Sequence, residues 1–360
     1  MRTGPSAKAL ASSVSWRPMV SSWLGVEVLA DVVPVLSGKI TWTVGQEVTA
    51  TLTMTVPGTS VENGRTRSWR PGRDPKHPLA RYGQKLDVSL LVDGYLLRLG
   101  RFGIQDWKDG DGGEIEVSGA GILQNASDDR LIVPTGPRDN GTLKSEFARL
   151  TPDYMTVQFD ASLVDRACPK AMEWDEERLK ALYEIADAWP ARLREDAWGG
   201  IQVLPPLPET PVPVMSFTDG EGGTLISAPT EDTREGSYNV FVARSSADGV
   251  EAQAVAAVEG GPMAASGEYR PVPTFWSSPL LANEAQCLAA AQTRRSNSTR
   301  QSIVRRVELV PDPRIEIDDA VELIVDKDTD DQVVDWGYVI GVELPLTVTD
   351  GPMQMDVATF

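Results

Sequence analysis

Histidine, cysteine and long apolar runs are scarce in this chain. The 360 residues include one histidine, His77, and two cysteines, Cys168 and Cys287. Two cysteines so far apart predict neither a disulfide framework nor a thiolate zinc site. His77 lies in a stretch rich in proline and arginine, beside no nucleophile that it could activate. No apolar run approaches the roughly 18 residues that a membrane span needs, and residues 3–22 lack the apolar core of a signal peptide, so we expect neither.

Motifs for metals, nucleotides and catalysis are also missing. Asp326, Asp328, Asp330 and Asp331 suggest a calcium loop, but position six of the pattern is Asp331 instead of glycine and position twelve is Gly337 instead of glutamate. The glycine-rich stretches lack the strand–GxGxxG–helix context of nucleotide sites. Acidic residues are plentiful, so counting leaves a glycosidase-like acid pair open, yet no pair is singled out. We therefore predict no catalytic, cofactor-binding or metal residues and no cofactor.

Charge is distributed unevenly along the chain. Residues 1–81 hold ten lysines and arginines against five acids, a net +5, whereas residues 82–360 hold 24 against 47, a net −23. A strongly acidic body repels phosphate backbones and speaks against sustained binding of nucleic acid. The same balance suits a surface past which DNA moves transiently without specific binding.

The basic charge of the N-terminal part is concentrated in residues 58–81, which we call the basic segment. Glycine and proline mark it as a long loop, and such loops are usually functional or disordered. It is either a docking element for an acidic neighbour or a solvated insertion, and in both cases deleting residues 60–80 should leave the fold intact. Its interface candidates are Arg65, Arg67, Arg70, Arg73, Lys76 and Arg81.

The first 24 residues predict an extended N-terminal arm. Serine is frequent, and Pro5 and Pro18 disfavour regular structure. Trp16 and Trp23 are the candidates for anchoring this arm on a neighbouring protein.

Two distant stretches share one β pattern. Residues 82–121 alternate apolar and polar side chains and break at Asp93-Gly94 and at residues 109–113, where glycine favours tight turns. Residues 319–359 repeat the alternation, with turns at 326–328 and 350–352. The spacing indicates that the chain builds the same small β unit twice. In the second copy, the alternation assigns Val342 to the apolar face.

Between these units the pattern changes. Residues 40–56 predict a further hairpin, and helical spacing appears at 142–150, 175–189 and 283–295, with Asp175 and Asn283 as predicted N-caps. The predicted fold is mostly β with α+β insertions, in which two related small β-barrel modules accompany a helix-containing middle domain. The predicted divisions are an arm (1–24), a first β-barrel module (25–125), a helix-containing middle domain with a proline-rich connector (126–214), a mixed α/β section (215–300) and a second β-barrel module (301–360, with parts of 215–260).

The order of these elements resembles a known family. The chain is similar to the tail hub (baseplate hub) proteins of long-tailed bacteriophages, most of all to minor tail proteins from phages of actinobacterial hosts. The resemblance spans roughly residues 25–358. The phrases that carry it are LSGKI (36–40), TATLTMTVPG (49–58), PLARYGQKLDVSLLVDG (78–94), LRLGRFGIQDW (97–107), YNVFVARSS (238–246), SSPLLANEAQCLAAAQTRR (277–295), RRVELVPDP (305–313), IEIDDAVELIV (315–325) and WGYVIGVELPLTV (336–348).

This resemblance implies a structural virion protein. Such hubs are homotrimers whose paired β-barrel modules join a six-fold distal tail protein ring to a three-fold tail tip, spike or fibre protein. They surround the channel for the tape measure protein and DNA. The implied location is the phage tail tip, after assembly in the host cytoplasm. Two alternatives stay open: the spike-carrying hub of a contractile injection system, and a tail-tip cell-wall hydrolase.

Overall fold

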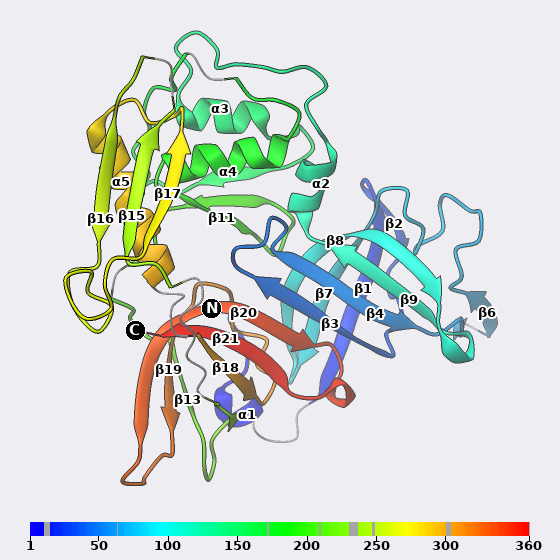
Figure 1. The fold of residues 1–360 in the computed structure, drawn as a ribbon. Coiled ribbons are helices and arrows are strands. Elements are labelled where there is room, and N and C mark those ends of the chain that lie inside the picture. The colour runs from blue at the N-terminus through cyan, green and yellow to red at the C-terminus, as the bar shows by residue number, and fades with distance from the viewer. Residues whose placement is uncertain are drawn as a thin grey trace.

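The computed structural model describes residues 1–10, 15–62, 64–170, 173–208, 210–229, 237–246, 249–299 and 304–359. Mainly antiparallel β-sheets form the regular structure of the described chain, as the sequence predicts, and Figure 1 shows one large sheet below a smaller, helix-containing part. Within these ranges, no helix is long and apolar enough to cross a membrane.

The large sheet has thirteen strands. They are β1 (Trp16–Leu24), β2 (Glu27–Ala30), β3 (Ser37–Thr43), β4 (Ala50–Val56), β7 (Gln84–Val92), β8 (Tyr95–Asp109), β9 (Ile115–Ala120), β13 (Met215–Thr218), β14 (Leu225–Ser227), β18 (Val304–Leu309), β19 (Ala320–Val325), β20 (Val333–Pro345) and β21 (Met353–Thr359).

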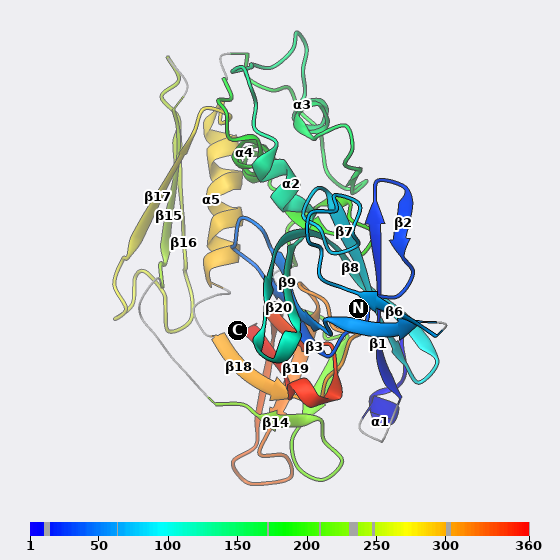
Figure 2. The same cartoon turned by 90° about the vertical axis from the view of Figure 1, so that its right-hand side faces the viewer.

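The smaller part has two groups of elements, and three short elements accompany the large sheet. The first group, the helical insert, comprises α2 (Ile122–Asp128), α3 (Leu143–Leu150), β10 (Val157–Phe159), α4 (Arg178–Ala188), β11 (Arg192–Glu195) and β12 (Ile201–Leu204). The second comprises β15 (Val240–Ser245), β16 (Gln253–Ala257), β17 (Pro273–Ser278) and α5 (Glu284–Thr299), and Figure 2 shows α5 between its sheet and the insert. The short elements are α1 (Ala7–Leu10), η1 (Asp111–Gly113) and η2 (Val348–Asp350).

The large sheet contains one strand order twice. The first unit runs β3-β4-β9-β8-β7-β1, and the second runs β14-β18-β21-β20-β19-β13. Each unit therefore has a long strand, β8 or β20, in the same place, followed by a short 3₁₀ helix and then by β9 or β21. The units differ at the last position, because β1 is antiparallel to β7 whereas β13 is parallel to β19.

The repeat extends to the register of the strands. In the first unit, Gly103 lies opposite Ala120, and the pairing then shifts by one residue between Ile104 and Asp106. In the second unit, Tyr338 lies opposite Ala358, and the same shift follows between Val339 and Gly341. A β-bulge at the same place in both long strands is a strong sign of a common design, because a bulge changes the local twist and register.

The two units are joined through β20 and β3. Five residues of β20, Gly341–Pro345, pair antiparallel with Lys39–Thr43 of β3. One continuous sheet results, and no pairing among the described strands closes either unit on itself. The closed barrel modules remain a prediction.

One apolar core serves both units. Val117 and Leu52 of the first unit and Val342 and Met355 of the second belong to the same buried cluster. Val342 is 3% exposed, as the alternation in the sequence predicts. The helical insert has a separate core around Phe147 and the apolar face of α4, and α5 packs over a third, smaller cluster.

The three predicted helices are present, with one difference at a terminus. Asn283 accepts a hydrogen bond from the Gln286 N–H, which confirms it as the cap of α5. Asp175 is not the cap of α4, because that helix begins at Arg178 with Glu177 in the N-cap position. The preceding segment is held in extended form by the pairing of Trp174 with residue 135 and by a Leu131 N–H that donates to the Glu176 carbonyl.

The N-terminal arm and the basic segment are more ordered than the sequence predicts. Residues 16–24 form β1, which pairs with β7 along its whole length, so this part of the arm belongs to the sheet. The basic segment contains an antiparallel hairpin of β5 (Thr59–Glu62) and β6 (Arg65–Ser68) instead of a continuous loop. In both places, proline, glycine and charged residues interrupt the apolar–polar alternation by which a strand is predicted from sequence.

Candidate functional site: a polar sheet face, a charged cleft and the basic segment

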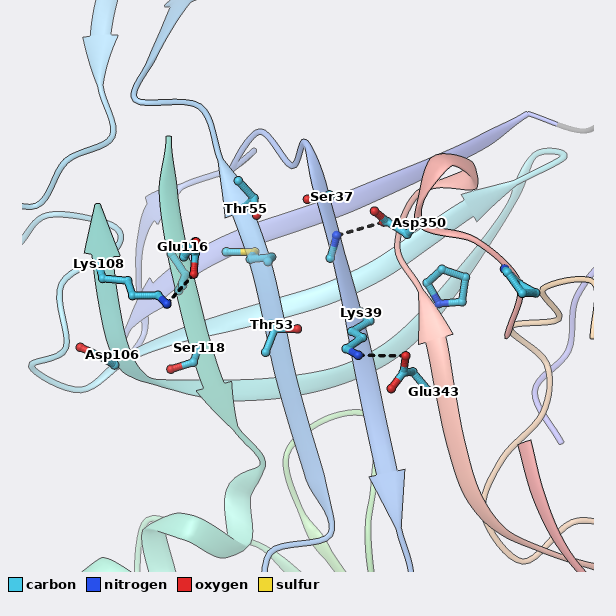
Figure 3. A pocket seen from close by; sticks show the side chains of 15 residues that line it. Ser37, Lys39, Thr53, Thr55, Asp106, Lys108, Glu116, Ser118, Glu343 and Asp350 are labelled. Atoms are coloured by element: carbon cyan, nitrogen blue, oxygen red, sulfur yellow. Dashed lines mark hydrogen bonds and ion pairs between the residues drawn. The ribbon is translucent and has the colours of Figure 1, made fainter. Parts of the chain in front are cut away.

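The outer face of the large sheet forms a shallow polar hollow. Five strands make its floor in the order β8, β9, β4, β3 and β20, as Figure 3 shows, so it crosses the junction of the two units. The hollow has a volume of about 590 Å³. Because strand side chains alternate between faces, Thr53 and Thr55 point outward while Leu52 and Met54 enter the core.

Charged side chains on this polar face pair across neighbouring strands. Lys108 of β8 lies 2.8 Å from Glu116 of β9, and Lys39 of β3 lies 2.9 Å from Glu343 of β20. Arg306 of β18 and Asp356 of β21 form a similar pair, 2.9 Å apart, further along the sheet. Exposed pairs contribute little to stability, but they give the face nearby charges of both signs and little net field.

A second hollow, the charged cleft, lies between the large sheet and the helical insert. Its volume is about 800 Å³. The wall residues that matter for its electrostatics are Arg2, Arg192, Arg194, Glu195, Glu316 and Asp318.

Ion pairs cross the charged cleft and connect the insert to the second unit. Arg192 of β11 pairs with Asp318, and Arg194 lies 3.3 Å from Glu316. Arg2 lies 3.6 Å from Glu316 as well. Burial alone would raise the pKa of Glu316, but Arg2 and Arg194 lower it, so this carboxylate is held charged. The cleft is therefore a compensated charge network.

Glu195 ties the insert to the first unit. Its carboxylate accepts hydrogen bonds from the Ile122 N–H at 3.0 Å, the Leu123 N–H at 3.4 Å and the Thr49 hydroxyl at 3.4 Å. These amides begin α2, so the carboxylate caps a helix from another part of the chain. It sits so close to Gly121 that a Cβ there would lie 1.9 Å from its Oε2. Burial raises the pKa of Glu195 to about 7 despite these bonds.

Asp87 and two arginines form another network at the edge of the insert. Arg98 and Arg101 lie 2.6 Å and 2.5 Å from the Asp87 carboxylate. Burial alone would raise the pKa of Asp87, but its bonds and charge interactions with the arginines lower it overall. Arg98 also stacks on Trp198, 4.1 Å from the ring centre, and donates to the Ala197 carbonyl of the insert.

The residues predicted in the basic segment do not form a single cluster. Arg70 pairs with Asp109 of β8 at 2.8 Å, and Lys76 lies 3.5 Å from Glu27. Arg67 stacks on Trp69, 4.4 Å from the ring centre. Five of the six members are exposed along the segment, namely Arg65, Arg70, Arg73, Lys76 and Arg81. The segment therefore offers several cationic side chains, some of them already paired within the chain.

The basic segment also contributes to the core. Trp69 and Leu79 are fully buried in the cluster shared by the two units. Deletion of residues 60–80 would remove Trp69 and Leu79 from the core, so we expect it to damage the fold, in contrast to the expectation from the sequence. His77 has a structural role here, because its Nδ1 accepts a hydrogen bond from the Leu79 N–H at 3.1 Å. The pKa of His77 is lowered, and burial is the largest cause.

The two predicted anchor tryptophans have partners within the chain. The Trp16 Nε1–H donates to the Leu346 carbonyl at 2.9 Å, and the Trp23 Nε1–H donates to the Ser21 hydroxyl at the same distance. Trp16 thus connects β1 to the end of the second unit. Both rings keep partial exposure, and their contact with a neighbouring protein stays a prediction.

Sequence reasoning missed the charged cleft and Glu195. Arg192, Arg194 and Glu195 lie in a short run, 192–195, with no helical or strand-like apolar signal. The ion-pair partners of Arg192 and Arg194, and the amides that Glu195 caps, are more than 70 positions away. In the described part of the chain, no three histidine, cysteine, aspartate or glutamate side chains gather as a metal site would require.

Comparisons with solved structures match this architecture over nearly the whole chain. A tail protein from Neisseria meningitidis aligns with 96% of this chain and 97% of its own, at a TM-score of 0.66 and 13% identity. The 43 kDa tail protein of prophage MuSo2 from Shewanella oneidensis aligns with 95% of this chain and 100% of its own, at a TM-score of 0.63 and 12% identity. The chain has the fold of phage tail proteins.

This tail-protein fold confirms the resemblance inferred from the order of elements. It also extends to a further kind of assembly, because a chain of the Francisella PdpA–VgrG complex aligns with 96% of this chain and 58% of its own, at a TM-score of 0.54 and 7% identity. No family model and no curated protein sequence matches the chain.

Proposed function

We propose that the protein is the trimeric hub of a phage tail. The observation that carries the proposal is the repeated unit, β3-β4-β9-β8-β7-β1 and β14-β18-β21-β20-β19-β13, within a tail-protein fold. Oligomers are generally symmetric, so a ring with a six-fold neighbour needs six similar surfaces. Three chains with two similar units each supply them.

Two opposite faces of such a ring would meet different partners. The quasi-six-fold face contacts the distal tail protein ring, and the three-fold face carries the tail tip, spike or fibre protein. The basic segment, with exposed Arg65, Arg73 and Arg81, is the docking element that we assign to an acidic neighbour. The protein is accordingly a virion protein of the tail tip, assembled in the host cytoplasm.

The charge of the chain supports a role around a channel. The net charge is −18, and the cross-strand pairs of the polar face leave little positive field there. Phosphate groups bind where cations are unpaired, so DNA and tape measure protein would pass without being retained.

The copy number tests the proposal. Native mass spectrometry of the purified protein, and of isolated tail tips, should show three copies. A different number in the tail tip would contradict the hub assignment. Cryo-electron microscopy of the same particles would show whether the two units alternate around the axis.

A spike-carrying hub in a contractile system is the second candidate. The similarity to a chain of the PdpA–VgrG complex favours it, although that chain is considerably longer. A contracted sheath in micrographs of the native particle would select this candidate. For the third possibility, a cell-wall hydrolase, the test is zymography on host cell wall, where a lytic band abolished by one carboxylate substitution would overturn the structural assignment.

A further inference from the structure

Two of the open strand edges in the large sheet belong to β14 and β8, whereas β2 and β13 provide others. β14 ends the sheet on one side. β8 pairs with β7 only as far as Gly103, so its part from Asp106 to Asp109 has β9 on one side and no described strand on the other. An open edge presents unpaired N–H and C=O groups, which make it a template for another strand.

The equivalent edge in the second unit is occupied. Beyond Tyr338, β20 keeps β21 on one side, and on the other side β19 gives way to β3. β20 corresponds to β8, because the same bulge follows Tyr338 in β20 and Gly103 in β8. By strand order, β3 corresponds to β14. The strand missing beside β8 is therefore the equivalent of β14.

Within one chain, β14 does not pair with β8. Six strands separate β14 from β8 in the sheet order, which corresponds to a path of about 34 Å at the usual strand spacing. A β14 strand that pairs with β8 would therefore come from a second copy. Such a contact joins two different surfaces, and contacts of this kind form a ring when the rotation closes.

We propose that β14 of a second copy pairs with the outer edge of β8 at Asp106–Asp109, as β3 pairs with β20 within one chain. This inference rests on the proposed trimer, in which β3–β20 and β14–β8 junctions alternate around one continuous sheet.

Exposed apolar groups agree with this pairing. Ile226 of β14 is 57% exposed, although it lies in a strand of a well-packed unit. Trp107 of β8 remains partly exposed, whereas its equivalent Val342, which has β3 beside it, is 3% exposed. A strand added along β8 would shield Trp107 in the same way, and Ile226 would leave water.

Cross-linking of paired cysteines tests the proposal. In the junction of β3 with β20, Gly38 forms hydrogen bonds with Leu346, just after β20, and with Asp350 of η2. The neighbour of Gly38, Ser37 of β3, occupies the position that Ser227 occupies in β14. The variant Asp111→Cys/Ser227→Cys therefore places one thiol in η1 and one in β14. The native Cys168 and Cys287 are buried, so a short bismaleimide should react mainly at the new sites. We expect a ladder on denaturing gels that stops at three chains.

Matched variants show whether the contact is specific. The single variants Asp111→Cys and Ser227→Cys should give no trimer band. The pair Asp111→Cys/Asp31→Cys places the second thiol just beyond β2, at the other end of the sheet, and should give none either. A trimer by native mass without the Asp111/Ser227 ladder, or with a ladder from the Asp31 pair instead, would overturn the strand pairing alone. A mass other than a trimer would overturn the hub assignment together with it.

Hydrogen exchange of the unmodified protein provides a second measurement. Those amides of residues 106–109 that point away from β9 should exchange at least about tenfold more slowly in the trimer than in the dissociated chain, because pairing protects strand amides. Equal rates in the two states would overturn the proposal without any variant.

Discussion

Glu195 shows how one side chain can connect two parts of a molecule. It comes from β11 of the insert, yet its carboxylate caps α2 and contacts Thr49 beside β4. Its partial burial raises its pKa, so ionisation opposes the folded state although its hydrogen bonds favour the charged form. The position is suited to a carboxyl that binds a proton near neutral pH.

We expect Glu195 to make stability depend on pH. Its folded pKa of about 7 lies above the ordinary value of 4.5, so the folded chain holds the proton more tightly than the unfolded chain. The resulting stabilisation is complete below pH 4.5 and is lost as pH rises to 7. Relative to Glu195→Gln, the free energy of unfolding of the native chain should fall by about 1–3 kcal/mol across this pH range. This figure is reduced for solvent contact through the cleft.

Denaturant unfolding of both proteins at several pH values would measure this difference. Glutamine keeps one acceptor oxygen but does not titrate, which makes it the matched control. Parallel pH profiles for the two proteins would contradict the role given to Glu195.

Val342→Asp should prevent soluble folding. Val342 is buried in the core shared by the two units, and an unpaired carboxylate there costs more than about 3 kcal/mol. Glu343→Ala, one residue away on the polar face, should change stability by less than about 1 kcal/mol. Soluble yield and thermal unfolding would compare the two, and equal behaviour would mean that the face assignment is wrong.

At the scale of elements, the basic segment combines two tasks. It displays exposed arginines, while its Trp69 and Leu79 belong to the shared core. Separate substitutions can therefore remove the exposed charges of the segment or its buried side chains.

Neutralising the exposed arginines should affect association only. We expect Arg65→Gln/Arg73→Gln/Arg81→Gln to keep the native unfolding temperature within about 2 °C, because all three side chains are exposed. Binding to the isolated distal tail ring should weaken and should become less sensitive to salt. Sedimentation of mixtures would measure this, and unchanged binding would argue against a docking role.

Removing the buried tryptophan should instead lower the stability of the fold. Trp69→Ala is expected to lower the free energy of unfolding by about 3–5 kcal/mol, since the ring is fully buried. Denaturant unfolding would measure the loss. A cost below about 1 kcal/mol would mean that the segment can be removed after all.

Local patterns predicted most elements but not their partners. Alternation and turn residues located β7, β8, β20 and the Asp93-Gly94 turn, where both residues have positive φ. They failed for β1 and the β5–β6 hairpin, where pairing with other strands overrides a composition typical of loops. The positions of Arg192 and Glu195 depend on contacts with distant segments, which periodicity does not encode.

At the scale of the whole molecule, the sequence indicated that a β unit is duplicated but not how the two units are joined. Spacing indicated two similar β units, and the structure adds the shared bulge and the common strand order. The fusion of both units through β20 and β3 was not predictable, because edge pairing depends on backbone groups that every sequence carries.

The overall charge leads to a prediction about DNA. The protein should give no mobility shift with double-stranded DNA at 0.15 M salt, since a net charge of −18 opposes phosphate binding. A charge-reversed control, Glu116→Lys/Glu343→Lys, would unpair Lys108 and Lys39 on the polar face and should bind weakly at low salt. Salt-sensitive binding by the native chain would contradict passage without retention.

The junction of β3 with β20 also imposes an order on synthesis and folding. β3 leaves the ribosome early, but its neighbour lies about 300 positions later in the chain. Until residues 341–345 are made, the β3 edge stays available to other strands, and such contacts fold slowly because a long loop must close. A nascent chain therefore cannot complete this sheet, and it cannot present a finished junction to a growing tail, before residue 345 has been made.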